Sequence, residues 1–406
     1  MDGSMPVALR PDFSISELRL SVDASAGPLE AEWRQLERCA SASVYQSFDW
    51  IDCWIAAATG PQGIRPAIVS VRYADGRLAA ILPLGLERIG PVRVARFLGG
   101  EHANIRMGLL DPEFAAWLNP DKAAALLDRV GKAIGRVDLF DLDAQPQQLN
   151  GAHNPLAALQ LASPARCDVG TMRLGSDFAT VLAAHRGAKK SKKRRWQANA
   201  LAAVGGSELV RAESQAEADA ILEDYFTQKA EWFRENGIAD SFAEPGVADF
   251  FKALAARRWS STDSAVLDLD AVVIDGKVRA ILGSGTLAGR LSGYFMSVAN
   301  DEWRRVSPGE LMLFEVISAS CERGLTSLDL GRGDERYKAS WLDQVEPHVR
   351  AVVPVTLMGT VAAGLFRAID RIERWVRDNP RLWQTLKRLR RWRGGRAENK
   401  PPTDAD

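Results

Sequence analysis

Two kinds of hydrophobic spacing alternate along the first 165 residues of this chain. Apolar positions two residues apart predict strands at 66–73 and 77–87, and Ala74-Asp75-Gly76 between them predicts a hairpin turn. Further strand-like segments lie at 92–98, 105–110 and 136–142. Spacings of three and four residues predict helices at 30–40, 48–58 and 114–134.

The same mixture begins again near Cys167. Three successive strands are predicted at 264–274, 277–286 and 290–298, because Asp275-Gly276 and Ala288-Gly289 are turn sequences. Shorter strands are predicted at 168–174, 208–212, 328–331 and 347–357. Ser176 is the expected N-cap of a short helix. Longer helices are predicted at 189–203, 215–236, 246–259 and 308–323.

Each half combines an antiparallel meander with strands joined through helices, which is an α+β pattern. At 406 residues the chain is longer than one hydrophobic core usually serves, so two domains are expected. We place an N-terminal domain at 18–165, a second domain at 166–358, a basic amphipathic helical tail at 359–396 and a disordered end at 397–406. The order of elements is compatible with a shared topology of the two domains.

Charge is distributed unevenly, although 52 basic and 52 acidic residues give a formal net charge of zero. Between Gly364 and Arg396, eleven Lys or Arg stand against three acids. Apolar residues repeat there at helical spacing, at Leu365, Ile369, Ile372 and Val376. An apolar stripe beside a basic face predicts a helix on an anionic membrane surface. The alternative is a helix packed against the body of the protein.

Several classes of protein are disfavoured by the composition. The four cysteines form no CxxC pair and lie far from the four histidines in sequence, which argues against a disulfide framework or a zinc site. The first 25 residues hold no apolar run typical of a signal peptide, and no 18 consecutive apolar residues predict a membrane span. We therefore expect a cytoplasmic protein without a metal, peripheral to the inner membrane through its tail.

The junction between the strand at 290–298 and the next helix is the candidate anion site. It has the sequence Arg304-Arg305-Val306-Ser307-Pro308-Gly309-Glu310. Ser307 as cap, Pro308 at the first helical position and Gly309 beside it would present free backbone N–H groups at the positive end of a helix. Arg304 and Arg305 would add guanidinium groups, which match phosphate oxygens. The alternative is a well-capped helix with two surface arginines.

Two sets of short motifs, spread over roughly residues 30–355, carry a resemblance. The first domain contains Glu32-Trp33-Arg34-Gln35-Leu36, Gln46-Ser47-Phe48-Asp49-Trp50 and Leu82-Pro83-Leu84. The second contains Lys229-Ala230-Glu231-Trp232, Ser307-Pro308-Gly309 and the segment 328–338. In order and spacing these motifs resemble the GNAT superfamily, in particular its tandem-domain CelD-like branch tied to bacterial cellulose and exopolysaccharide synthesis.

The resemblance implies two tandem GNAT-like folds related to the Fem-type transferases. It also implies that acetyl-CoA or another acyl-CoA binds mainly to the second domain, at the Arg304–Glu310 junction. This chain departs from the family in one respect. The usual pyrophosphate signature is a glutamine- or arginine-led glycine run, and here it is reduced to residues 304–309.

Catalytic candidates follow the strand at 328–331. In the GNAT pattern, a tyrosine after this strand protonates the departing sulfur of CoA, and Tyr337 stands at the matching place. A tyrosine with its ordinary pKa near 10 is protonated at neutral pH and can donate. Asp334 is the candidate base, and Lys338 is a candidate for orienting the acceptor. The alternatives are a packed tyrosine and an acid-rich, solvated helix start.

A basic run at 186–196 holds seven Lys or Arg in eleven residues and ends at Trp196. It suits a nucleic acid, the 3′-phosphate of CoA, an anionic glycan, or a simple solvated helix face. We do not expect a nucleic-acid partner.

The leading hypothesis is an acyl-CoA-dependent N-acyltransferase acting on an amino sugar, nucleotide sugar or polysaccharide intermediate. Direct attack on the thioester is expected, because no Ser or Cys lies in a recognisable nucleophile motif. One rival is Fem-like transfer from aminoacyl-tRNA. The other is a non-catalytic accessory protein of a polysaccharide synthase.

Overall fold

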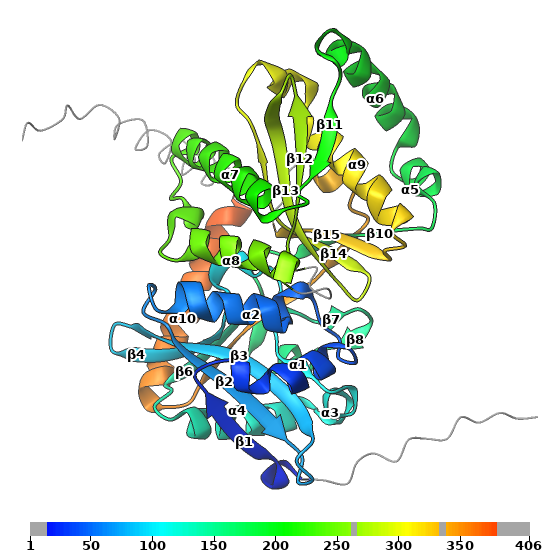
Figure 1. The fold of residues 1–406 in the computed structure, drawn as a ribbon. Helices are drawn as coiled ribbons and strands as arrows, with labels where there is room; N and C mark the ends of the chain where they lie inside the picture. The colour runs from blue at the N-terminus through cyan, green and yellow to red at the C-terminus, as the bar shows by residue number, and fades with distance from the viewer. Residues whose placement is uncertain (1–13, 261–265, 333–337, 380–406) are drawn as a thin grey trace, which may run out of the picture.

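The computed structural model describes residues 14–260, 266–332 and 338–379 of the chain. These residues form two units, each a large sheet with helices packed on it (Figure 1). The expected α+β class is confirmed.

The first sheet has eight strands in the order β1-β2-β3-β4-β6-β17-β9, with β5 paired to β3. Its strands are β1 (Arg19–Asp23), β2 (Arg65–Arg72), β3 (Leu78–Ile89), β4 (Val92–Phe97), β5 (Leu109–Leu110), β6 (Leu139–Pro146), β9 (Ala162–Pro164) and β17 (His348–Pro354). Two further short strands, β7 (Gln148–Leu149) and β8 (Ala152–His153), pair with each other. The predicted hairpin of β2 and β3 is confirmed, whereas the strand expected at 105–110 is reduced to β5.

The helices of the first unit are α1 (Glu30–Glu37), α2 (Phe48–Trp54), α3 (Pro112–Trp117) and α4 (Pro120–Ile134). The single helix expected at 114–134 is therefore wrong. It is split because Pro120 has no N–H to continue the first helix, and because Asn119 caps a new one by accepting a 2.9 Å hydrogen bond from the Lys122 N–H.

The second sheet has seven strands in the order β11-β12-β13-β14-β15-β10-β16. They are β10 (Val169–Arg173), β11 (Glu208–Arg211), β12 (Asp268–Ile274), β13 (Lys277–Leu287), β14 (Arg290–Val298), β15 (Ser327–Arg332) and β16 (Gln344–Glu346). Its helices are α5 (Phe178–Ala184), α6 (Gly187–Leu201), α7 (Gln215–Asn236), α8 (Val247–Ser260) and α9 (Pro308–Glu322). Helix α7 covers one face of this sheet and α9 the other (Figure 1).

Helix ends in the second unit follow local chemistry. Helix α7 has the predicted bounds, because the Ser214 side chain accepts from the Glu217 N–H and Gly237 ends the helix in the left-handed conformation. The expected cap of α5 is wrong by one residue. The side chain of Asp177, not of Ser176, accepts from the N–H groups of the first turn.

The two sheets share a topology. In each, an antiparallel meander leads to a strand whose next neighbour is parallel, β4 beside β6 and β14 beside β15. In each sheet the strand after this parallel pair is distant in sequence. In the first sheet β6 is followed by β17, the last described strand of the chain, and in the second sheet β15 is followed by β10, the first strand of the second unit. The two units are thus interlocked by the return of the chain from residue 348 to the first sheet.

Aromatic side chains fill the contact between the units. Trp50 and Trp54 of α2 stack on each other, and both meet the ring of Phe250 on α8 edge-on, at centroid distances of 4.9 and 5.0 Å. All three are buried, so the core is continuous from one unit to the other. This contact fixes the first unit against the second.

Helix α10 (Leu357–Asp378) follows β17 and packs on β17, β6 and β4. It begins after Thr356, whose hydroxyl accepts a 3.1 Å hydrogen bond from the Gly359 N–H. The predicted tail helix is therefore present as far as Asp378, and residues 380–406 lie outside the described part. None of the helices that the structure describes is long and apolar enough to cross a bilayer.

Candidate functional site

The parallel strands β14 and β15 pair only at their start. Their register joins Arg290 to Ser327, Leu291 to Leu328 and Ser292 to Asp329. Strand β14 then continues to Val298, away from β15. A parallel pair that opens in this way exposes backbone groups along a gap, where an extended ligand can bind.

A buried charge network holds the paired end closed. Asp329, which has no exposed surface, accepts hydrogen bonds from Arg290 Nε at 2.8 Å and from Ser292 Oγ at 2.6 Å. Its other oxygen accepts from the Gly331 N–H at 3.0 Å. Arg290 is neutralised further by Glu346 on β16 at 2.7 Å. The gap therefore opens next to a rigid, fully paired cluster.

Asn104 of the first unit enters this gap. Its Nδ2 donates to the carbonyl of Gly293 at 3.3 Å, and its Oδ1 accepts from the Arg332 N–H at 3.3 Å. It thus bonds both separated strands. Gly331 has φ +71°, and a Cβ there would lie 2.6 Å from Asn104 Nδ2, so glycine is required for both reasons.

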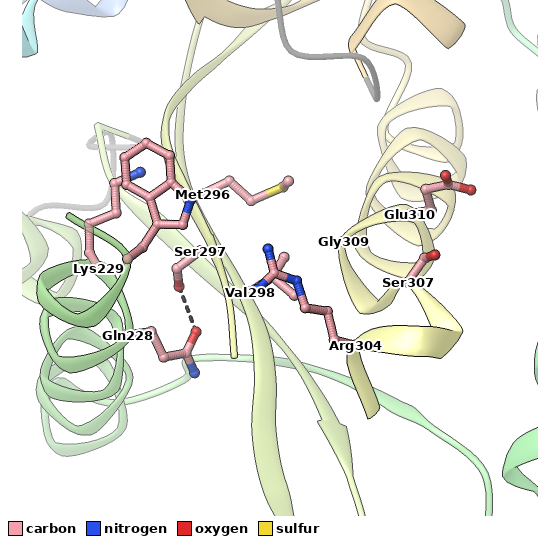
Figure 2. Close-up of a pocket in the computed structure, with 10 residues that line it drawn as sticks. Gln228, Lys229, Met296, Ser297, Val298, Arg304, Ser307, Gly309 and Glu310 are labelled. Carbon is pink, nitrogen blue, oxygen red and sulfur yellow. Dashed lines mark hydrogen bonds between the residues drawn. The ribbon is translucent and has the colours of Figure 1, made fainter. Parts of the chain in front are cut away.

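Two adjoining cavities follow β14 from the gap to the start of α9. The larger, of about 370 Å³, is lined by Gln228, Lys229, Trp232, Met296, Ser297, Val298, Arg304, Ser307, Gly309 and Glu310 (Figure 2). The smaller, of about 130 Å³, reaches the gap and includes Asn104, Gly293, Leu330, Gly331 and Lys338. Both are lined by Lys229 and Met296, so they form one path with a helix start at one end.

The start of α9 differs in detail from the expected cap. Ser307 is the N-cap residue but has φ 55°, and its side chain makes no cap hydrogen bond to the first turn. Its hydroxyl instead accepts from Lys193 Nζ at 3.2 Å. Pro308 occupies the first turn as predicted. The Ser307 side chain therefore does not cover this turn, but Pro308 has no N–H, and the Glu310 and Leu311 N–H groups donate to the Ser307 carbonyl at 3.0 and 3.3 Å. The Gly309 N–H and the helix dipole remain suitable for an anion.

Gly309 lets this helix start approach β14 closely. A Cβ at residue 309 would lie 3.1 Å from Val298 Cγ2 and 3.2 Å from Met296 Cε. Glu310 adds a negative charge to the same turn, but Lys193 pairs with it at 2.6 Å. The net result is a narrow site with one basic side chain brought in from α6.

The predicted cofactor residues divide into two groups. Arg304, Ser307, Gly309 and Glu310 line the larger cavity. Arg305 lies over the ring of Trp303 instead, at 5.8 Å, and Val306 and Pro308 are buried. Two neighbouring arginines thus have different surroundings, which the sequence does not distinguish.

Of the predicted catalytic residues, only Lys338 belongs to the described part. It is buried, lines the smaller cavity and donates from Nζ to the Arg332 carbonyl at 2.8 Å. It begins a single 3₁₀ turn, Lys338–Ser340. Asp334 and Tyr337 lie outside the described residues, and their roles stay predictions.

Sequence reasoning missed several residues of the site. Lys193 belongs to the basic run that was considered for the 3′-phosphate of CoA, and it is the member of α6 that reaches the start of α9. Gln197, on the same helix, donates to the Val306 carbonyl at 2.7 Å. Lys229 and Trp232 were noted only as a family motif, and both line the larger cavity.

In the first unit, ion pairs join the corresponding parallel strands β4 and β6. Arg96 of β4 donates from Nε to Asp141 of β6 at 2.8 Å, and Arg350 of β17 donates to Asp141 at 2.6 Å. Burial disfavours the charged form of Asp141, but the hydrogen bonds and charges of Arg350 and Arg96 outweigh it and lower its pKa. A cavity of about 320 Å³ remains beside these residues and is lined by charged groups of both signs.

His348 lies at the start of β17 and is buried. Neither of its ring nitrogens has a hydrogen-bond partner in the described structure. Burial, followed by the charges of Arg332, Arg290 and Arg106, lowers its pKa from 6.5 to about 3. The native protein therefore holds this imidazole neutral at pH values where the unfolded chain protonates it.

This difference predicts acid sensitivity. Below pH 6.5 the unfolded chain binds a proton at His348 that the native state does not bind, so the free energy of unfolding falls as the pH drops toward 3. Above pH 6.5, His348 is neutral in both states and does not make stability depend on pH. His348→Gln should reduce the loss of unfolding free energy between pH 7 and pH 5 by about 2 kcal/mol. Chemical denaturation at the two pH values measures it, with the exposed His153→Gln as control. An equal loss in wild type and His348→Gln would contradict the assignment.

Comparison with known proteins agrees with this geometry. Residues 188–339 match the family model described as an acetyltransferase (GNAT) domain. The second unit has a GNAT-type acyltransferase fold. The matched GNAT segment begins in α6 and ends just after β15. It contains the start of α9, all residues that line the larger cavity, and those that line the smaller one except Asn104.

Solved structures extend the similarity in fold over both units. FemX superimposes with a TM-score of 0.55 at 11% identity, covering 82% of this chain and 97% of that one. The C-terminal domain of a putative lysylphosphatidylglycerol synthetase from Agrobacterium fabrum gives 0.51 at 13% identity, covering 84% and 96%. A tandem GNAT protein from the clavulanic acid pathway gives 0.41 at 13% identity, covering 84% and 99%. A search of curated proteins finds no match.

Proposed function

We propose that this protein is an acyl-CoA-dependent N-acyltransferase that modifies an amino sugar, nucleotide sugar or polysaccharide intermediate. The observation that carries the proposal is the path along β14, which joins a helix start to an opened parallel strand pair. Acyl-CoA has an anionic end, a long extended arm and a reactive thioester. These three parts match the start of α9, the edge of β14 and the gap beside Gly293.

The anionic end would bind at the first turn of α9. The Gly309 N–H and the helix dipole favour a pyrophosphate there. Arg304 lines the same cavity, and Lys193 is within reach of the turn through its contacts with Ser307 and Glu310. Trp232, partly exposed at the cavity wall beside Lys229, offers an aromatic face to the adenine.

The extended arm would lie along the open edge of β14. Beyond Ser292 this strand has no parallel partner in the described structure, so its backbone groups can pair with the amides of the arm. Met296 borders both cavities and supplies an adaptable apolar wall. The thioester would then sit at the gap, next to Leu330 and Lys338.

The reaction proposed is direct transfer. An amine of the acceptor attacks the thioester carbonyl, the carbon–sulfur bond breaks, and the acyl group leaves on nitrogen as an amide. Asp334 would take the proton from the amine, and Tyr337 would give one to the departing thiolate. Tyr337 directly precedes Lys338 in the sequence, and Lys338 lines the cavity at the gap. This adjacency supports the assignment.

A polar acceptor fits the surroundings of the gap. Arg332 lies there between Glu101 at 3.8 Å and Asp143 at 3.6 Å, both from the first unit. Such groups can hydrogen-bond hydroxyls and charges of a sugar or nucleotide. The motifs shared with the CelD-like branch favour a polysaccharide intermediate, with the protein acting in the cytoplasm near the inner membrane.

Isothermal titration with acetyl-CoA tests the proposal, and two adjacent arginines provide a matched pair. Arg304→Ala should weaken binding about 10-fold or more, because it removes a charge-assisted contact to a phosphate. Arg305→Ala removes the same charge one residue away from the cavity and should leave affinity within about 2-fold. Failure of wild type to bind acetyl-CoA or longer acyl-CoAs would overturn the proposal and favour an accessory protein of the same fold.

A further inference from the structure

Helix α10 presents an apolar face to solvent. Its exposed large hydrophobic side chains, between 40% and 89% exposed, are Leu357, Met358, Val361, Leu365, Ile369, Ile372 and Trp375. At a helical repeat of 3.6 residues these positions share one side of the helix and run along its full length. An unbroken apolar face of this size on a globular protein marks an interaction surface.

The orientation of α10 is fixed by its opposite side. Ala362, Ala363 and Phe366 pack against β4, β6 and β17. Asp370 forms an ion pair with Arg350 at 2.6 Å, and Glu373 forms one with Arg166 at 2.8 Å. The helix therefore cannot rotate its apolar face inward without breaking these contacts, so the face is outward in the native fold.

Basic residues border the apolar face. Arg367, Arg371 and Arg374 follow one another at spacings of four and three, along one edge of the helix. The sequence continues with seven Lys or Arg and no Asp or Glu between residues 379 and 396. An apolar strip with arginines beside it has the chemistry of a helix that lies in the interface of an anionic bilayer.

We infer that the outward face of α10 docks this protein onto a membrane rich in anionic phospholipid. A second copy of the chain is the competing occupant. It would bring two such basic segments together, and like charges repel, whereas anionic headgroups attract both. The inference does not depend on the proposed function.

The inward side of α10 also borders a cavity of the first unit. Arg350 and Arg166, which pair with Asp370 and Glu373 of this helix, line the charged cavity of the first unit.

Co-sedimentation of the full chain with vesicles tests the inference. Wild type should sediment with vesicles of phosphatidylcholine mixed with phosphatidylglycerol, and much less with phosphatidylcholine alone. Leu365→Glu should reduce partitioning by about 10-fold or more, because a charge replaces an apolar side chain that would insert into the bilayer. Val345→Glu on β16 is the matched control, since Val345 is exposed to a similar extent, and it should bind as wild type does.

Each other outcome overturns the inference. Wild type that stays in the supernatant excludes a lipid surface. Equal binding by Leu365→Glu and wild type would assign the attraction to the basic sequence alone. A wild-type dimer that Leu365→Glu converts to a monomer in analytical ultracentrifugation, without vesicle binding, would identify the second copy as occupant. The affinity of Leu365→Glu for acetyl-CoA should equal that of wild type. A failure of membrane docking can therefore be distinguished from a failure of the proposed acyltransferase function.

Discussion

Gly309→Glu is expected to abolish acetyl-CoA binding, with a loss of affinity of at least about 100-fold. A carboxylate at this position would lie in the first turn of α9, where the pyrophosphate is proposed to bind, and like charges at close range cost several kcal/mol. It would also need space that is already filled, because Val298 and Met296 approach to within 3.1 and 3.2 Å of the Cβ position. Isothermal titration of wild type and variant measures the loss.

The control for this experiment is a glycine with open surroundings. Gly60 has no atom within 4 Å of its Cβ position, so Gly60→Glu adds the same charge without a clash. It should bind acetyl-CoA as wild type does. If Gly309→Glu proves misfolded by circular dichroism, Arg304→Ala still reports on the cavity from its surface position. Wild-type affinity in a folded Gly309→Glu would place the anionic end of acyl-CoA elsewhere.

Asp329→Ala is expected to lower stability by about 3 kcal/mol, which corresponds to a thermal midpoint roughly 6–12 °C lower for a unit of this size. The substitution leaves Arg290 buried beside a cavity and removes the acceptor of Ser292 Oγ and the Gly331 N–H. This loss of stability is at the lower end of the range of about 3–5 kcal/mol for breaking a buried ion pair, because Glu346 still neutralises Arg290. Differential scanning calorimetry measures the midpoint.

An exposed ion pair supplies the comparison. Asp75 pairs with Arg77 in the β2–β3 turn with both side chains largely in solvent. Asp75→Ala should therefore leave the midpoint as in wild type. A midpoint of Asp329→Ala equal to that of Asp75→Ala would show that the cluster does not hold β14 and β15 together.

The site itself was only partly predictable from sequence. The helix start at Pro308 follows from local chemistry, since proline suits the first turn and glycine permits close approach. Arg304 and Arg305 look equivalent in sequence, yet only their packing directs one to the cavity and the other over Trp303. Lys193 could not be assigned, because its contact with Ser307 joins residues 114 positions apart.

By itself the sequence determined most elements of this fold, because periodicity, caps and turn residues act over a few neighbours. Helix α7 and strand β14 have their predicted bounds for that reason. Pairing was decided only in three dimensions. A periodic pattern indicates which face of an element is buried, but it does not indicate which other element covers that face. It therefore could not place β17 beside β6, nor Asn104 between β14 and β15. The same holds for α10, whose apolar stripe is visible in sequence but faces outward because Asp370 and Glu373 fix the other side.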